Sequence, residues 1–104
     1  MLFDLQKNYT KYSGLQNKYG EQFIVFNNDS VISKEILVSG EFDLKKLEKT
    51  INFLKTKKNI KIKNLYDIGA NIGVICIPAV NRGLVEKAYA VEPENNNFRL
   101  LKAN

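Results

Sequence analysis

Two acidic residues and two glycines are spaced in a way that predicts a ligand-binding site at one edge of a sheet. Asp67, Gly69 and Gly73 lie within the run Leu-Tyr-Asp-Ile-Gly-Ala-Asn-Ile-Gly, which indicates a strand end, a turn and a helix start. Glu92 follows nineteen residues after Gly73, at the end of a second strand-like run. A strand, a crossover helix and a parallel strand form a βαβ unit, and ligands bind beyond the carboxyl ends of such strands. We therefore expect all four residues to meet there.

The two carboxylates indicate which class of ligand suits this site. A loop that holds a dinucleotide has the spacing G-x-G-x-x-G, and its bare N–H groups bind the pyrophosphate. Here the spacing is D-x-G-x-x-x-G, with Asn71 at the middle position, and Asp67 would bring a negative charge close to any phosphate. Glu92 can accept hydrogen bonds from two ribose hydroxyls, because an ionised carboxylate has only acceptors. A cationic or hydroxyl-rich ligand therefore suits the site better than a phosphate.

The glycines and Asn71 have predicted roles in the backbone. Gly69 lets the chain leave the strand through a sharp turn in which φ can be positive. Gly73 has no Cβ, so the start of the helix can approach the strand and the ligand. Asn71 lies near the N-terminus of that helix, where we expect its side chain to cap free N–H groups.

The run from Asp67 to Gly73 resembles the first S-adenosylmethionine-binding motif of class I methyltransferases. The longer pattern resembles the FkbM family, which often shows D-x-G-A-N-x-G, then E-P, then an Asn and a Leu on the following helix. A proline that is frequent two residues after the E-P pair is Asn95 here. The upstream segments at 31–33 and 40–42 also resemble that family, so the resemblance covers residues 29–104. The residues that match downstream of the glycine motif are Glu92, Pro93, Asn97, Leu101 and Asn104.

The resemblance implies an enzyme that uses S-adenosyl-L-methionine to methylate a hydroxyl oxygen of a small molecule or glycan. It implies an α/β chain that forms the first half of a Rossmann-like methyltransferase fold, with the βαβ unit and glycine loop in residues 43–104. A small α+β entry segment would occupy residues 1–42. Because the family's sheet has seven strands, we expect these 104 residues to be an N-terminal part that is inactive alone. The residues expected to bind the cofactor are Asp67, Gly69, Ala70, Asn71, Gly73, Glu92, Pro93 and Asn97.

Other interpretations of the same residues remain open. The glycines can form a purely structural βα turn or belong to a nicotinamide site. The chain can also be a non-catalytic, truncated remnant that binds a partner, or a small nucleotide-binding or nucleic-acid-binding protein. Its net charge is +5, from 16 basic and 11 acidic residues. The lysines alternate with acids and asparagines, which is more typical of a solvated surface than of a nucleic-acid interface. Cofactor titration separates a methyltransferase or its remnant from a nucleotide-binding or nucleic-acid-binding protein, and extending the gene at its 3′ end separates the methyltransferase from the remnant.

The composition of the chain excludes several other kinds of site. A chain of 104 residues forms one domain with a modest core. It contains no histidine, and its single cysteine, Cys76, lies in an apolar segment, so we predict no metal site and no disulfide. No residue stands out as the catalytic base. No signal peptide is evident and the longest apolar run, residues 74–80, is too short to span a membrane, so we expect a cytoplasmic protein.

The first third of the chain mixes helix-like and strand-like patterns. Residues 1–20 carry leucines and tyrosines at gaps of three and four, which predicts one amphipathic helix or two helices divided near Ser13 and Gly14. Residues 22–26 form an apolar run that predicts a strand before a turn. Val31 and Ile32 suggest a returning strand.

Two helices are expected next. Ser33 is a candidate cap for a short helix that continues to Val38 and stops at Gly40. Asp43 is a candidate cap for a longer helix. The apolar positions of that longer helix predict one buried stripe, at Leu44, Leu47, Ile51 and Leu54.

The βαβ unit occupies the rest of the chain. Residues 65–68 form an almost continuous apolar run, as expected for a strand with helices on both faces. The crossover helix is predicted over residues 72–82, with a kink or a late start because Pro78 removes one backbone donor. Residues 87–91 are the second predicted strand, and residues 94–104 begin a third helix.

Overall fold

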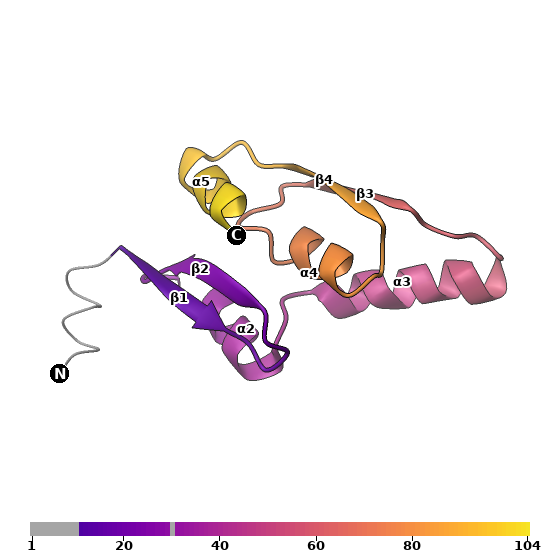
Figure 1. Ribbon diagram of the computed structural model, residues 1–104, viewed down its shortest axis with the longest axis horizontal. Coiled ribbons are helices and arrows are strands. Elements are labelled where there is room, and N and C mark those ends of the chain that lie inside the picture. The colour runs from indigo at the N-terminus through magenta and orange to yellow at the C-terminus, as the bar shows by residue number, and fades with distance from the viewer. Residues whose placement is uncertain (1–10, 30) are drawn as a thin grey trace.

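An antiparallel hairpin and a parallel strand pair, together with four helices, make up the part of the chain that the computed structural model describes, residues 11–29 and 31–104 (Figure 1). This is a mixed α/β arrangement, as predicted. None of the four described helices has the length and apolar character that a membrane span requires. The elements are β1 (Tyr12–Gln16), β2 (Gln22–Phe26), α2 (Ile32–Ser39), α3 (Leu44–Lys57), β3 (Asn64–Ile68), α4 (Cys76–Asn81), β4 (Lys87–Val91) and α5 (Asn95–Ala103).

The N-terminal hairpin corrects the helix predicted over residues 1–20. Residues 12–16 form β1, which pairs antiparallel with β2 and places Gly14 opposite Ile24. The backbone groups of the apolar strand β2 need partners, and β1 supplies them along one edge. Spacings of three and four between tyrosines and leucines do not exclude a strand, and here pairing with β2 overrides the helical pattern. Residues 1–10, the rest of the predicted helix, lie outside the described residues.

Helix α2 begins where a returning strand was predicted, so that prediction is wrong. The Asp29 carboxylate accepts hydrogen bonds from the backbone N–H groups of Val31 and Ile32, both at 3.0 Å. An acceptor at this position satisfies free donors at a helix start, and the helix begins at Ile32 rather than at a cap on Ser33. The predicted stop at Gly40 is confirmed.

Helix α3 confirms the predicted apolar stripe. Leu44 and Ile51 are buried, and Leu47 packs against them from a half-buried position. Asp43 precedes the helix as expected but makes no capping hydrogen bond, and its φ of 57° is left-handed. Its carboxylate instead forms an exposed ion pair with Lys46 at 3.2 Å. A surface pair of this kind contributes little stability, so the buried stripe is what holds α3.

The βαβ unit has the predicted order, and its second strand has the predicted bounds. Strands β3 and β4 are parallel, with Ile68 opposite Val91. Between them, α4 starts at Cys76, later than the predicted residue 72, so Pro78 is the third helical residue. An N–H at that position has no partner within the helix, and the proline ring therefore costs no hydrogen bond.

The parallel sheet is covered on one face within the described residues. Helices α3 and α4 lie beneath it in Figure 1, and residues of α4 and α5 line a pocket together with Ala88 and Ala90 of β4. The opposite face exposes Tyr66 and Ile68 (67% and 74% of their surface), together with Tyr89. The rings of Tyr66 and Tyr89 stack with centroids 4.9 Å apart. The apolar run in β3 predicted helices on both faces of the strand. In the described residues, helices cover only one of the two faces.

Two apolar clusters hold the elements together. One joins the hairpin, α2, the glycine loop and α5, and the other joins α3, α4 and the segment before β4. The first cluster contains residues from both predicted segments, 1–42 and 43–104. Its buried members are Phe23, Val25, Ile36, Ile72, Val74 and Leu100.

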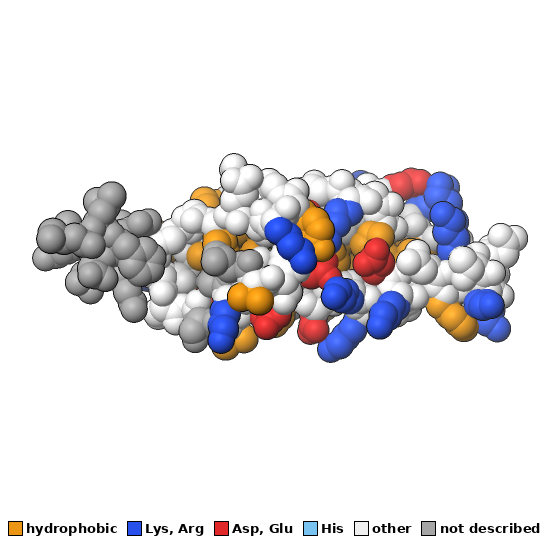
Figure 2. All heavy atoms as spheres, turned by 90° about the horizontal axis from the view of Figure 1, so that it is seen from below, with side chains coloured by type: hydrophobic (Ala, Val, Ile, Leu, Met, Phe, Trp, Pro, Cys, Tyr) orange, Lys and Arg blue, Asp and Glu red, His pale blue; other side chains and the backbone are white. Residues whose placement is uncertain are grey.

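Charged side chains are dispersed over the face that Figure 2 presents. Lysines and arginines there are interrupted by acidic, polar and apolar side chains, without one continuous basic patch on that face. This distribution is that of a solvated surface.

Candidate functional site

The two predicted acidic residues lie at the carboxyl ends of neighbouring strands. Asp67 is the fourth residue of β3, and Glu92 follows the last residue of β4, so the parallel register brings both to one edge of the sheet. Oδ2 of Asp67 and Oε2 of Glu92 are buried and accept no hydrogen bond from the residues that the structure describes. A buried acceptor without a donor costs about 1–3 kcal/mol. A ligand with hydroxyl or ammonium donors would remove that cost at both positions.

The glycine loop is fastened to the end of β4. The N–H groups of Gly69 and Ala70 both donate to the carbonyl of Val91, at 2.8 and 3.0 Å. Gly69 has φ of +81°, which confirms the predicted sharp turn, and a Cβ there would meet no atom within 4 Å. The backbone beside Gly69 is therefore open to a ligand.

Gly73 has a role that differs in part from the prediction. Its φ is +95°, and a Cβ added to it would clash with the side chain of Ile77 and approach Cδ1 of Leu101 at 3.0 Å. The space that the missing Cβ leaves is thus filled by α4 and α5. Close approach is confirmed, but the approaching groups are the protein's own apolar side chains.

Asn71 does not cap the helix, so the predicted cap is wrong. Helix α4 starts at Cys76, and the residue at its N-cap, Ile75, makes no side-chain cap. Asn71 instead adopts a left-handed conformation with φ of 55°, which asparagine tolerates better than most residues. Three left-handed residues in five delay the helix and keep the loop next to the strand ends.

Cys76 is the first residue of α4, directly after the glycine loop. Its side chain is buried, as predicted. Burial, together with the charge of the Asp67 carboxylate and a hydrogen bond to it, raises the pKa of the thiol to about 11. The protonated thiol is a poor nucleophile.

Of the remaining predicted residues, Ala70 is buried in the loop, Pro93 is exposed and Asn97 lies on the first turn of α5. The backbone N–H of Asn97 donates to Oε2 of Glu94 at 2.8 Å, which caps α5. Hydrogen bonds from the N–H groups of Asn97 and Asn96 lower the pKa of the Glu94 carboxyl. The structure thus brings Asp67, Gly69, Ala70 and Glu92 together and leaves Asn97 beside a neighbouring pocket.

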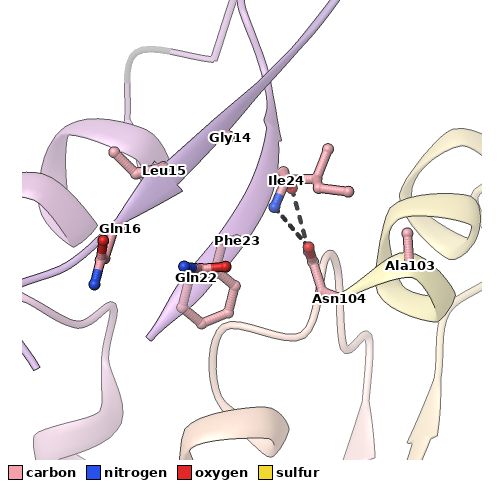
Figure 3. A pocket seen from close by; sticks show the side chains of 8 residues that line it. All are labelled: Gly14, Leu15, Gln16, Gln22, Phe23, Ile24, Ala103 and Asn104. Atoms are coloured by element: carbon pink, nitrogen blue, oxygen red, sulfur yellow. Dashed lines mark hydrogen bonds between the residues drawn. The ribbon is translucent and has the colours of Figure 1, made fainter. Parts of the chain in front are cut away.

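Asn104 joins the hairpin to the glycine loop, a role that the sequence did not reveal. Its carboxamide accepts a hydrogen bond from the N–H of Ile24 at 2.6 Å and donates to the carbonyl of Ile24 at 3.2 Å (Figure 3). It also donates to the carbonyl of Ile72 at 2.9 Å. One side chain therefore bonds both backbone groups of Ile24 on the outer edge of β2 and the carbonyl of Ile72 in the glycine loop. Its place in the resembled motif is the one signal that singled it out.

Replacing Asn104 with alanine should lower the free energy of unfolding by about 1–2 kcal/mol, because three backbone groups lose a partner. Urea denaturation of the wild type and the variant measures the difference. The exposed Asn81→Ala substitution in α4 is the matched control and should change stability by less than about 0.5 kcal/mol. Equal effects of the two substitutions would show that Asn104 does not join the hairpin to the loop.

Arg82 anchors the hairpin to the end of α4. Its guanidinium donates to Glu21 at 2.6 and 3.2 Å and to Glu41 at 2.7 Å, and the ring of Tyr19 lies 4.3 Å away. Burial raises the pKa of the Glu21 carboxyl, but hydrogen bonds from Arg82 and Asn17 outweigh it and hold that pKa below its ordinary value. The partners are 61 and 41 residues from Arg82, so no local pattern could have revealed the cluster.

A comparison of the chain with protein-family models, curated proteins and solved structures yields no match.

Proposed function

We propose that this chain binds S-adenosylmethionine at the carboxyl ends of β3 and β4, as the cofactor site of an FkbM-type O-methyltransferase. The observation that carries the proposal is the pair of buried carboxylate oxygens, on Asp67 and Glu92, that lack donors within the described chain. They lie on adjacent strand ends beside a glycine turn with open space at Gly69. This set of acceptors fits a ligand that carries ribose hydroxyls and positive charge.

Each residue of the site has a proposed task. Glu92 accepts hydrogen bonds from the ribose hydroxyls, since its free oxygen can take a donor without losing an existing bond. Asp67 provides negative charge for the cationic end of the cofactor. The backbone at Gly69 and Ala70, held by Val91, leaves room for the ligand to approach. When bound, the cofactor supplies an electrophilic methyl group on a sulfonium, and the residues named here bind and orient it.

A dinucleotide or another phosphate ligand fits less well. The two carboxylates, each with a buried oxygen that lacks a donor within the described chain, would both repel a pyrophosphate at this edge. Helix α4 also has only six residues and starts at Cys76, after the glycine loop. Its N-terminal dipole would therefore contribute little to binding a phosphate at the strand ends.

A partner-binding module is the second function that an observation favours. The sheet face with Tyr66, Ile68, Tyr89 and Val91 is apolar and exposed in the described chain. Exposed apolar faces of this kind mark interaction surfaces. Binding of the cofactor product is what separates the two functions.

Replacing Glu92 with glutamine should weaken binding of S-adenosylhomocysteine by about 1.5–3 kcal/mol, because a charge-assisted hydrogen bond is lost. Isothermal titration calorimetry measures the affinity. Glu86→Gln is the matched control, since Glu86 precedes the opposite end of β4 and its carboxylate forms an exposed ion pair with Lys61. Absence of binding to the wild type would refute the proposed function, whereas unchanged affinity in Glu92→Gln would remove Glu92 from the site.

A further inference from the structure

A pocket of about 510 Å³ lies between the end of β2 and the start of α5, with both polar and apolar side chains in its lining. Its volume is in the range of small-molecule sites. In Figure 1 these two ends lie on the same side of the molecule as the carboxyl ends of β3 and β4, and Glu94 follows Glu92 by two residues. The pocket is lined by Lys11, Phe26, Asn27, Asn28, Glu94, Asn96 and Asn97.

Carboxamides dominate the polar part of the lining. Asn28, Asn96 and Asn97 each offer two donors and one acceptor, the combination that pairs with hydroxyl groups, which donate and accept. Asn27 is already engaged, since its Oδ1 accepts a hydrogen bond from the Ser13 hydroxyl. The pocket is thus lined by several carboxamides and by two charged side chains, Lys11 and Glu94.

The two charged side chains in the lining have opposite signs. Lys11 and the Glu94 carboxylate interact electrostatically, and the Glu94 oxygen is also held by the α5 backbone. An anionic ligand would meet Glu94 and a cationic one would meet Lys11, so neither sign is favoured. An apolar ligand would leave the carboxamides without partners, which is costly.

An aromatic wall completes the pocket. Phe26 is half-buried, and its ring packs at a tilt of 44° against Tyr12, with centroids 5.5 Å apart. A pyranose has a rim of hydroxyls and two faces of C–H groups. The carboxamides match the rim, and the flat apolar ring of Phe26 matches a face.

We propose that this pocket binds a neutral saccharide, which is the hydroxyl-bearing methyl acceptor. The role as acceptor rests on the proposed function, whereas the binding of a saccharide does not. The pocket and the cofactor site then lie on one side of the fold, served by two consecutive segments, the end of β4 and the start of α5.

The test is an NMR titration of the isotope-labelled protein with methyl glycosides of glucose, galactose, mannose and fucose, each alone. At least one sugar should produce saturable shifts of the side-chain amides of Asn28, Asn96 and Asn97, with a dissociation constant on the order of 1 mM. The amides of Asn52 and Asn81, on α3 and α4, should not move. Failure of all four sugars, or shifts spread over the surface, would overturn the proposal.

A pair of double variants tests the residues. Asn28→Ala with Asn96→Ala should weaken the sugar at least fivefold, and Asn52→Ala with Asn81→Ala should leave its affinity unchanged. All four positions are exposed or half-exposed, and the spectra report directly whether each variant folds. Equal affinity in the two double variants would overturn the pocket as the site.

Titration with S-adenosylhomocysteine in the same samples keeps the two proposals distinguishable. Binding of S-adenosylhomocysteine without any sugar overturns the saccharide site alone. Binding of a sugar without S-adenosylhomocysteine supports the saccharide site and overturns its role as acceptor together with the proposed function. Binding of both supports both.

Discussion

Replacing Arg82 with methionine is expected to lower the free energy of unfolding by about 3–5 kcal/mol at neutral pH. The side chains of Glu21 and Glu41 are only 12% and 7% exposed, and both depend on the guanidinium for compensation of their charge. Methionine retains most of the volume, so the loss measures the uncompensated carboxylates rather than a cavity. Urea denaturation of the two proteins gives the difference.

Two further sets of substitutions test whether the loss of stability in Arg82→Met comes from the unpaired carboxylates. Arg99→Met on α5 removes an exposed cation and should cost less than about 0.5 kcal/mol. Adding Glu21→Gln and Glu41→Gln to Arg82→Met should recover much of the stability, because buried charges no longer remain unpaired. A cost for Arg82→Met as small as that of Arg99→Met would refute the anchoring role.

The loss of stability in Arg82→Met should depend on pH. The pKa of Glu21 in the folded protein lies below its unfolded value of 4.5, so its contribution is present above that pH and is lost as the pH falls through the folded value. Without Arg82, burial would instead raise that pKa, and protonation would then favour the folded state. The deficit of Arg82→Met should therefore be largest at neutral pH, begin to shrink above 4.5 as the variant's Glu21 takes up a proton, and shrink further below 4.5 as the wild type loses its contribution.

The second large effect is expected for Gly73→Ala, which should lower the free energy of unfolding by about 2–4 kcal/mol. Strain at φ of +95° contributes about 1–2 kcal/mol, and the clash with Ile77 and Leu101 contributes the rest. Gly69→Ala is the matched control, since its φ is also positive but its Cβ would meet open space. It should cost only the strain.

Thermal and urea unfolding of both glycine variants measure this difference. Ile77→Val removes the methyl group that meets the new Cβ, so it should stabilise the Gly73→Ala protein although it costs about 0.5–1.5 kcal/mol in the wild type. Equal costs for the two glycine variants, with no recovery through Ile77→Val, would mean that the space beside Gly73 is not filled as described.

Local chemistry was sufficient to predict several features from the sequence alone. The strand over residues 87–91, the stripe on α3, the stop at Gly40 and the turn at Gly69 each depend on residues within one element or one loop. Periodicity and positive φ act over a few residues, so they are readable without knowledge of the fold. The neighbouring positions of Asp67 and Glu92 followed from the rule that parallel strands share their carboxyl ends.

Tertiary contacts decided the rest. Strand β1 exists because β2 needs a partner for its backbone, although the tyrosine spacing favours a helix. Asn104 and Arg82 act on residues that are 80 and 61 positions away, and a pattern within one element cannot contain such contacts. Gly73 is small because side chains of α4 and α5 converge on it. The sequence by itself determined the residues that can meet a ligand; the packing of the hairpin, α4 and α5 determined how the loop that carries them is held.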